Sequence, residues 1–445
     1  MAAIVVVGGG IAGLTCAWRL QRAGHDVEVL EREPNAGGRL RSERRGDFVV
    51  ERGAQFVTGA YRNLHAVVAA LGLQGRLRGH VQRGEAVLRD GAMLSADVAS
   101  PWRLIASPLL SPAAKLRLTR LPFLLLQHRH QLEPLHPERA AELDRGSMAA
   151  VLRPVVGEEA FDFLVAPIFS AIFDAEPEDL SVAFALLMLR FFAGGARPQS
   201  FAGGNGELTR ALARQVTVRA GCEAIAVETE TDGARVRYRR GGRDGAVFAD
   251  AVVIAVPGSE VAGLCAKLTP AERGFFEQVR YARGIVAHLL LPRVPRPLPP
   301  GGLAFPRRAG FDLYGLAVDH HKPGVAPPGA GLVNAALCDT ASERLWHEED
   351  AAVAELVLAN LARTPIGRLE PSEVVVHRWP AMLPCFYSGY LKQLASFQRR
   401  MERSPRMAFA GDYLLGPTVE AALTSGMRAA TEISRALSRP GTSPK

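Results

Sequence analysis

The stretch "IVVVGGGIAGLTCAWRLQRAGHDVEVLERE", Ile4–Glu33, decides the fold. Its apolar run Ile4–Val7 predicts a buried strand, and the residues after the glycines have the character of a short helix. Val27 and Val29 then alternate as a second strand, which Glu31 closes. Strand, glycine turn, helix and strand make a βαβ unit, so the sequence predicts an α/β protein built on a parallel sheet.

The glycines of this turn match the pattern GxGxxG, which binds dinucleotides in Rossmann-like domains. Gly8 makes the turn, Gly10 lets a pyrophosphate approach the backbone, and Gly13 lets the helix pack on the strand. Free N–H groups at the helix start would hold the phosphates, and Glu31 would accept hydrogen bonds from ribose hydroxyls. An ordinary glycine turn is the alternative, but the strand, the helix and the acid are all present. The predicted contacts are Gly8, Gly10, Ile11, Ala12, Gly13, Glu31 and Arg32.

The composition is typical of a soluble globular protein with two or three domains, because the chain has 445 residues, 48% of them hydrophobic. The net charge is +8, but no block of Lys and Arg is interleaved with aromatic residues, so nucleic-acid binding is not predicted. The five cysteines are scattered without a CxxC pair, which argues against a zinc site or a disulfide framework. We therefore expect a cytoplasmic location, without a secretion signal or a membrane span.

Two further segments carry a family resemblance. "EREPNAGGRLRS" adds Gly38 and Arg39, a second glycine turn followed by a cation for the pyrophosphate. "VVERGAQFV" adds Gly53, Ala54 and Gln55 on a strand and turn. Together these segments resemble the flavin-containing amine oxidase superfamily, which includes monoamine oxidases, protoporphyrinogen oxidases and phytoene-type desaturases. The resemblance implies bound FAD and an oxidoreductase.

The C-terminal stretch "RMAFAGDYLLGPTVEAALTSGMRAATEI" resembles the part of this superfamily that reaches the flavin half of the cofactor. The resemblance places Gly411 and Asp412 by the ribityl chain and pyrophosphate. It places Val419, mainly through its backbone, and Glu420 at the flavin edge. The positive end of the following helix would stabilise the anion of reduced flavin. A helix that only caps the core is the alternative.

The resemblance adds two positions in the middle of the chain. Cys222 falls where the superfamily contacts adenine through a backbone group, although a small buried hydrophobic residue is the favoured interpretation. Pro257 follows an apolar strand and would close a turn near the flavin. The cofactor domain would then be discontinuous, and the architecture would be of the p-hydroxybenzoate hydroxylase and amine oxidase type. We predict a FAD-binding domain over 1–60, 200–265 and 403–445, a helical part over 61–199, and a mixed β/α substrate domain over 266–402.

The substrate class is predicted from the group of the superfamily that each segment of the chain resembles. "AIFDAEPEDLSVAFALLML", "SFAGGNGELTRAL" and "HRWPAMLPCFYSGYL" resemble the protoporphyrinogen oxidases, whereas "PTVEAALTSG" is closer to the amine oxidases. Amine oxidases bring a lysine near the flavin, and Tyr281–Pro306 contains none. They also use two facing aromatics, matched here by Phe386 and Thr418, with Tyr387 as a further pocket candidate. We therefore expect hydride transfer from a bulky, apolar substrate to FAD, with O2 reoxidising the flavin.

Several alternatives stay open. Cys385 lies near the position of the flavin-linked cysteine of monoamine oxidases, but non-covalent FAD is the default. Ser107–Gln131 is apolar and basic and would either lie on a membrane surface or cover the active-site funnel, with Pro122 breaking its helix. His320-His321 is predicted to lie in a surface loop without metal. A non-catalytic escort protein on the same fold is the competing class, and the complete set of cofactor motifs argues against it. An NAD-dependent dehydrogenase would leave the C-terminal motif unexplained.

Overall fold

A five-stranded parallel sheet forms the N-terminal body of the protein. The computed structural model describes residues 1–80, 84–97, 101–194, 197–400 and 404–438. In spatial order the strands are β10 (Thr217–Ala220), β2 (Asp26–Glu31), β1 (Ala3–Val7), β14 (Ala251–Ile254) and β20 (Met407–Phe409). The sheet thus collects strands from both ends and the middle of the chain, and the predicted α/β fold with a Rossmann-like domain is confirmed.

Helices cover one face of this sheet and a β-meander covers the other. α1 (Ile11–Arg22) and α16 (Val419–Leu437) pack on the side of Ile4 and Val6. The meander β11 (Cys222–Thr229), β12 (Ala234–Arg240) and β13 (Arg243–Ala249) shares a core with Val5 and Val7 on the other side. β1 is therefore buried on both faces, as the unbroken apolar run of its sequence indicates.

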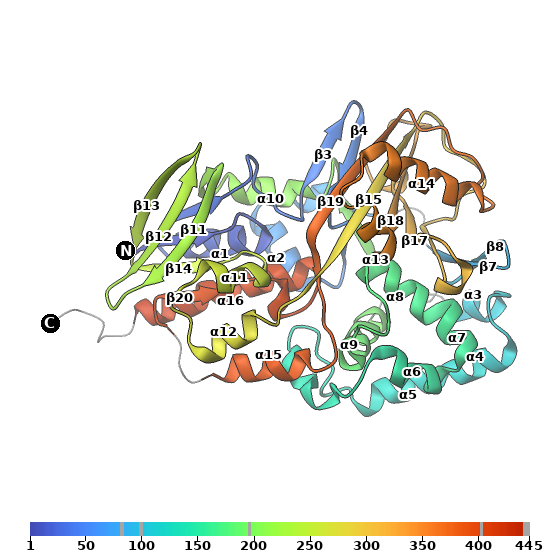
Figure 1. Cartoon of the computed structure of the whole chain (residues 1–445), viewed down its shortest axis with the longest axis horizontal. Helices are drawn as coiled ribbons and strands as arrows, with labels where there is room; N and C mark the ends of the chain where they lie inside the picture. The colour runs from blue at the N-terminus through green and yellow to red at the C-terminus, as the bar shows by residue number, and fades with distance from the viewer. Residues whose placement is uncertain (81–83, 98–100, 195–196, 401–403, 439–445) are drawn as a thin grey trace.

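The two covering helices touch each other closely because small residues face one another. A Cβ atom added to Gly426 of α16 would lie 2.1 Å from the backbone oxygen of Ala12 in α1. The N-terminal segment and the C-terminal helix are therefore one packed unit (Figure 1).

A seven-stranded sheet forms the second body, at the upper right of Figure 1. Its order is β19 (Glu373–Pro384), β15 (Tyr281–Leu291), β18 (Gly331–Leu337), β17 (Leu313–Val318), β16 (Gly302–Ala304), β7 (Glu85–Arg89) and β8 (Ala92–Ser95). α13 (Asp339–Arg344) and α14 (Asp350–Ala362) share a core with one face. The hairpin β3 (Ser42–Arg45) and β4 (Phe48–Glu51) packs on the other face through Val49 and Val50.

Residues 61–199 are mainly helical, as predicted. The helices are α2 (Arg62–Ala70), α3 (Pro101–Ala106), α4 (Pro112–Leu118), α5 (Arg120–Gln127), α6 (Met148–Val156), α7 (Glu158–Ala160), α8 (Ala166–Phe173) and α9 (Val182–Ala193). The break expected at Pro122 falls at Thr119, because a proline is tolerated in the first turn of a helix and Pro122 lies in that turn of α5.

The remaining elements connect the two bodies. They are β5 (Val57–Thr58), β6 (Leu77–Gly79), β9 (Pro198–Phe201), α10 (Gly206–Ala213), α11 (Gly258–Leu264), α12 (Pro270–Phe276) and α15 (Tyr390–Arg399). Within the described ranges no helix is both long and apolar enough to cross a bilayer. The predicted domain bounds stay a prediction, and β7 and β8, from within 61–199, join the seven-stranded sheet.

Candidate cofactor site and active site

The glycine turn between β1 and α1 leaves an open cradle beside the backbone. Gly8 has φ of +105°, and a Cβ atom there would lie 2.7 Å from the oxygen of Ala255. At Gly13 an added Cβ would lie 2.0 Å from the oxygen of Gly8. Gly10 differs from both, because an added Cβ would meet no atom within 4 Å. Gly8 and Gly13 are thus required for packing, whereas Gly10 faces space in which a pyrophosphate fits.

The start of α1 is free to bind an anion. Its N-cap is Gly10, no side chain caps it, and its first turn has no acidic residue. The N–H groups at Ile11 and Ala12 therefore keep the positive end of the helix directed at the cradle.

Glu31 stands at the end of β2 with its carboxylate fixed beside the cradle. One oxygen accepts a hydrogen bond from the Gly9 N–H at 2.7 Å, and the other accepts from the Glu33 N–H at 2.7 Å. The side chain is buried, which suits a residue that anchors a ribose. Arg32 instead points outward and pairs with Glu260 at 3.2 Å on the surface.

Arg39 and Asp412 meet across the two ends of the chain. Nη1 of Arg39 lies 2.7 Å from Oδ2 of Asp412, and Nη2 donates to Oδ1 at 3.1 Å. The hydroxyl of Tyr281 also donates to Oδ1 at 3.1 Å and accepts from the Gly258 N–H at 3.1 Å. Burial, followed by the charge of Asp412, raises the pKa of Tyr281 well above its usual value, so the hydroxyl stays a donor. Gly38-Arg39 and Gly411-Asp412, which were predicted separately as cofactor contacts, therefore lie side by side.

The second glycine turn lies against the first. Gly38 has φ of +55°, and a Cβ atom there would be 3.3 Å from the Cα atom of Gly10. Gly53 lies still closer to Arg39, because an added Cβ would be 2.3 Å from the Arg39 oxygen. The oxygen of Ala54 accepts from the Asn205 side chain at 3.2 Å. The backbone segments at Gly10, Gly38 and Gly53 lie close together around the cradle. The glycines keep side chains out of this crowded region.

Gln55 is held by a buried polar network that sequence reasoning missed. Its Nε2 donates to the oxygen of Gly53 at 3.0 Å, while its Oε1 accepts from Lys322 Nζ at 3.1 Å and from Asn334 Nδ2 at 3.0 Å. Lys322 is buried and pairs with Asp319 at 2.6 Å. A lysine is thus present beside the predicted flavin contacts, although it comes from outside Tyr281–Pro306.

His288, on β15, is fully buried, and the charge of Lys322 acts on it. Neither of its ring nitrogens has a hydrogen-bond partner in the described part of the chain. Burial, followed by the charges of His377 and Lys322, holds its pKa well below the usual value, so the ring is neutral. An unpaired neutral imidazole in a buried site can accept or donate one hydrogen bond to a bound molecule.

The residues predicted at the flavin edge lie at the start of α16. Thr418 caps the helix by accepting from the Ala421 N–H at 3.1 Å. The carboxylate of Glu420 accepts from the N–H groups of Asn63 and Leu64 at 2.8 and 2.9 Å, so it caps α2. Any contact of Glu420 and Val419 with flavin is therefore expected from the backbone.

The other two pocket candidates, Phe386 and Tyr387, lie between β19 and α15. Phe386 is 1% exposed and stacks on Phe184 with ring centroids 5.1 Å apart. The hydroxyl of Tyr387 donates to the Gln278 oxygen at 3.0 Å. The aromatic ring beside Thr418 is instead Tyr61, which hydrogen-bonds Thr418. The predicted cage of two facing positions thus stays a prediction, and Tyr61 is the aromatic that the sequence did not single out.

Three other predicted positions have clear surroundings. Cys222 is fully buried at the start of β11, which fits the favoured interpretation as a small buried residue. Pro257 precedes α11 as its N-cap, directly after β14. His320-His321 was predicted in a surface loop, and the pair lies half-buried in a 3₁₀ turn between β17 and β18.

Comparisons with known proteins identify the family of this chain. A family model described as flavin containing amine oxidoreductase matches residues 11–434. Protoporphyrinogen oxidase 2 of Arabidopsis thaliana is 20% identical over 478 residues, covering 96% of this chain and 92% of that protein. Coproporphyrinogen III oxidase of Propionibacterium freudenreichii subsp. freudenreichii is 24% identical over 495 residues, covering 97% and 90%.

Among solved structures, cyclohexylamine oxidase from Brevibacterium oxydans IH-35A superposes with a TM-score of 0.80 at 18% identity, covering 98% of this chain and 100% of that one. This likeness shows the shared fold, and the family match extends from the first residue of α1 into α16. The chain belongs to the flavin containing amine oxidoreductase family and is an FAD-dependent oxidoreductase.

Proposed function

We propose that this chain oxidises a C–N or C–C bond of an apolar, polycyclic small molecule, with O2 as the final electron acceptor. FAD, when bound, accepts a hydride from the activated C–H bond of the substrate. The observation that carries the proposal is the two-point pair of Arg39 with Asp412, because it joins the N-terminal cradle to the start of α16 where the flavin half is expected.

The protein's own groups would bind FAD and orient it. The cradle at Gly10 and the free start of α1 would hold the pyrophosphate, and Glu31 the ribose. Arg39 would supply a cation to the phosphates while Asp412 fixes its direction. The start of α16 would stabilise negative charge on the reduced ring system.

The apolar substrate class rests on the helical part and on the relatives. Phe173 packs edge-on against Phe184 at 5.1 Å, and Phe184 stacks on Phe386, so a buried aromatic cluster lies in this part of the protein. Two relatives that span nearly the whole chain are named for porphyrinogens, which are bulky and polycyclic. A porphyrinogen is therefore the first substrate to test, and a carotenoid-type polyene is the second.

Non-covalent FAD is part of the proposal. Cys385 is half-buried, and burial raises the pKa of its thiol to about 11. A thiol of this kind is rarely the thiolate that attacks a flavin. The competing reading, a non-catalytic escort protein, has no need of the open space at Gly10.

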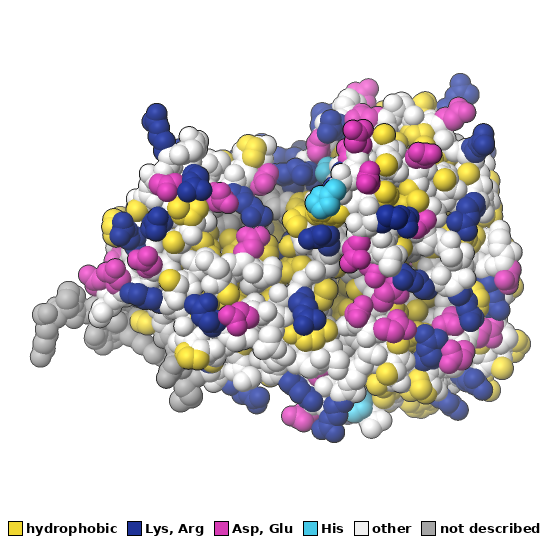
Figure 2. Space-filling model, in the orientation of Figure 1, with side chains coloured by type: hydrophobic (Ala, Val, Ile, Leu, Met, Phe, Trp, Pro, Cys, Tyr) yellow, Lys and Arg dark blue, Asp and Glu magenta, His cyan; other side chains and the backbone are white. Residues whose placement is uncertain are grey.

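Peripheral membrane contact is the last part of the proposal. Five of the large hydrophobic side chains that are exposed in the described ranges lie on α3, α4 and α5: Trp102, Ile105, Leu116, Phe123 and Leu126. Yellow surface lies over α5 at the lower right of Figure 2. The exposed Arg117 and Arg120 flank these residues and suit an anionic bilayer. We propose that the protein acts in the cytoplasm with this face on a membrane.

The direct test is anaerobic bleaching of the flavin absorbance. Purified protein is mixed with coproporphyrinogen III, with cyclohexylamine, or with a polyene, and reoxidation is followed after air is admitted. Rapid bleaching by the porphyrinogen and slow or no bleaching by the amine is the expected result. Bleaching by the amine alone would overturn the substrate class. A protein that takes up no FAD, even when FAD is added, would leave only the escort reading.

A further inference from the structure

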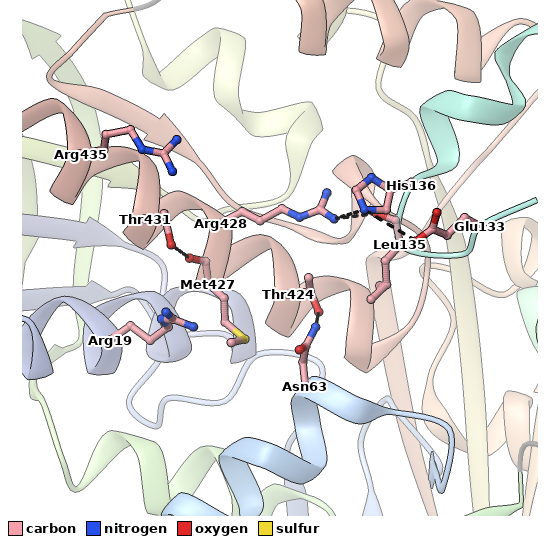
Figure 3. A pocket seen from close by; sticks show the side chains of 10 residues that line it. All are labelled: Arg19, Asn63, Glu133, Leu135, His136, Thr424, Met427, Arg428, Thr431 and Arg435. Atoms are coloured by element: carbon pink, nitrogen blue, oxygen red, sulfur yellow. Dashed lines mark hydrogen bonds and ion pairs between the residues drawn. The ribbon is translucent and has the colours of Figure 1, made fainter. Parts of the chain in front are cut away.

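A hollow lined by arginines lies on the outer face of α16, away from the glycine cradle. Its volume is about 550 Å³. Its walls come from α1, the start of α2, α16 and the segment between α5 and residue 137, as Figure 3 shows. The lining residues are Arg19, Asn63, Glu133, Leu135, His136, Thr424, Met427, Arg428, Thr431 and Arg435.

Arg19 enters the hollow from the last turn of α1. It is half-buried and reaches toward Met427 (Figure 3). Within the described ranges, no hydrogen bond or ion pair engages its guanidinium group. An anion bound in the hollow would give this half-buried cation a partner.

Arg428 lies in the same wall, also half-buried. It donates to the oxygen of Leu135 at 2.8 Å and contacts Nε2 of His136 at 3.4 Å, but it hydrogen-bonds no carboxylate among the described residues. Burial lowers the pKa of Arg428, although the charges of Glu138 and Glu133 oppose the change.

The pKa values of several other arginines shift in the opposite direction. Five that hydrogen-bond a carboxylate have raised pKa values: Arg39, Arg153, Arg219, Arg239 and Arg307. Arg428 is therefore a desolvated guanidinium group that lacks the partner these arginines have.

Arg435 completes the cationic wall. It follows Arg428 by seven positions, so both lie on one face of α16, with Thr424 and Thr431 on the same stripe. Arg435 is exposed and has neither a hydrogen bond nor an ion pair in the part of the chain that the structure describes.

The single carboxylate of the hollow is already engaged. Glu133 pairs with Arg139, which lies outside the lining, and its other oxygen is 3.9 Å from Nε2 of His136. The lining therefore holds three guanidinium groups and no other carboxylate, although the charge of Glu138, beside the lining, also acts on Arg428. Leu135 and Met427 add apolar surface between the charges.

We propose that this hollow binds a small organic oxyanion with at least two negative charges, carried by phosphate or carboxylate groups. Guanidinium groups match both kinds of oxyanion through paired N–H donors, and three of them from two helices would chelate one ligand. The volume exceeds what a bare phosphate ion needs, so a ligand with an organic body fits. The site goes beyond the proposed oxidation, because its arginines lie in the last turn of α1 and between the middle and the end of α16.

The test uses the full chain loaded with FAD, so that the cofactor cradle is occupied. Thermal unfolding is followed in sodium chloride, in inorganic phosphate, and in citrate at equal ionic strength. The variants are Arg19→Gln and Arg435→Gln. The matched control is Arg22→Gln, which removes the same charge from the same last turn of α1 but does not line the hollow.

A saturable rise in Tm is expected for the wild type and for Arg22→Gln with at least one oxyanion. Arg19→Gln and Arg435→Gln should need about tenfold more ligand for half the rise, with unchanged flavin absorbance. A response to phosphate alone assigns a phosphorylated ligand, and a response to citrate alone assigns a polycarboxylate. No response in the wild type, or equal responses in all variants, would overturn the site. Arg435 is exposed, so its variant keeps the test valid if Arg19→Gln does not fold.

Discussion

Arg39 and Asp412 are 373 positions apart in the chain, yet the guanidinium group and the carboxylate form a two-point pair with a shortest distance of 2.7 Å. Asp412 also accepts from Tyr281, so three segments of the chain converge on one carboxylate. This convergence fixes the positions of the second glycine turn and of α16 relative to each other.

Replacing Asp412 with alanine is expected to leave the guanidinium group of Arg39 partly buried without its partner. We expect a loss of about 2–4 kcal/mol in the free energy of unfolding together with loss of bound FAD. Urea unfolding and the ratio of flavin to protein absorbance measure the two effects. Asp244→Ala is the control, because it removes an exposed carboxylate from its pair with Arg239. Equal behaviour of the two variants would contradict the role of Asp412.

The glycine cradle predicts opposite outcomes for two neighbouring glycines. Gly10→Ala adds a Cβ that meets nothing within 4 Å, at an ordinary φ of −74°. The flavin-free variant should therefore fold with wild-type stability while its affinity for FAD falls at least about tenfold. Gly13→Ala should fail to fold, because its Cβ would lie 2.0 Å from the Gly8 oxygen. Full FAD binding by Gly10→Ala would mean that the cofactor does not occupy this space.

The sequence predicted this cradle well because a βαβ unit is local. Strand, turn and helix follow one another within Ile4–Glu33, so spacing alone places Gly10 and Glu31 at one edge. The pairing of Arg39 with Asp412 has no local signal. The resemblance placed each residue near the cofactor but did not predict the pair, because the intervening chain does not indicate which segments return to the first sheet.

Burial explains what the sequence did not predict. Lys322 follows a histidine pair and has the pattern of an exposed turn, but packing between the two sheets buries it against Asp319 and Gln55. An apolar residue such as Phe386 fits both a hydrophobic core and a substrate pocket, so its residue type does not show in which of them it lies. The structure surrounds it with aromatic rings, among them Phe184. Such decisions depend on tertiary contacts, which periodicity does not contain.

Asp174 is expected to make stability depend on pH. It ends α8 in the left-handed region with φ of +49°, and burial raises its pKa from 3.8 to about 7. The folded state thus binds a proton that the unfolded state has released between about pH 4 and pH 7. Stability from this group is greatest below pH 4 and falls as the pH rises to 7.

Asp174→Asn should remove this loss, because asparagine tolerates the same backbone and carries no charge. We expect a gain of about 1–3 kcal/mol at pH 8 and little gain at pH 4, measured by urea unfolding at both values. Asp179→Asn, an exposed position in the same segment, is the control and should show no such pH-dependent gain. A gain of equal size at both pH values would contradict the assignment.

The exposed face of α3, α4 and α5 predicts binding to anionic vesicles. Phe123→Ser should reduce co-sedimentation with vesicles that contain phosphatidylserine, because Phe123 is 72% exposed beside basic residues. Phe248→Ser is a matched control, since Phe248 is 71% exposed on β13, in the β-meander that covers the parallel sheet. Binding that is weak for the wild type, or lost equally in both variants, would exclude a membrane role for this face.

Lys322 and Asp319 form a buried pair whose members should be costly to separate. Lys322→Met leaves the Asp319 carboxylate without its cation, and a loss of about 3–5 kcal/mol is expected, as for other broken buried pairs. The double variant with Asp319→Asn should recover part of this loss, because neither charge then remains. If the pair only supports the fold, the double variant should also regain FAD binding and the rate of flavin bleaching. If Lys322 acts on Gln55 beside the flavin, as its 3.1 Å hydrogen bond suggests, stability should recover while the bleaching rate stays low.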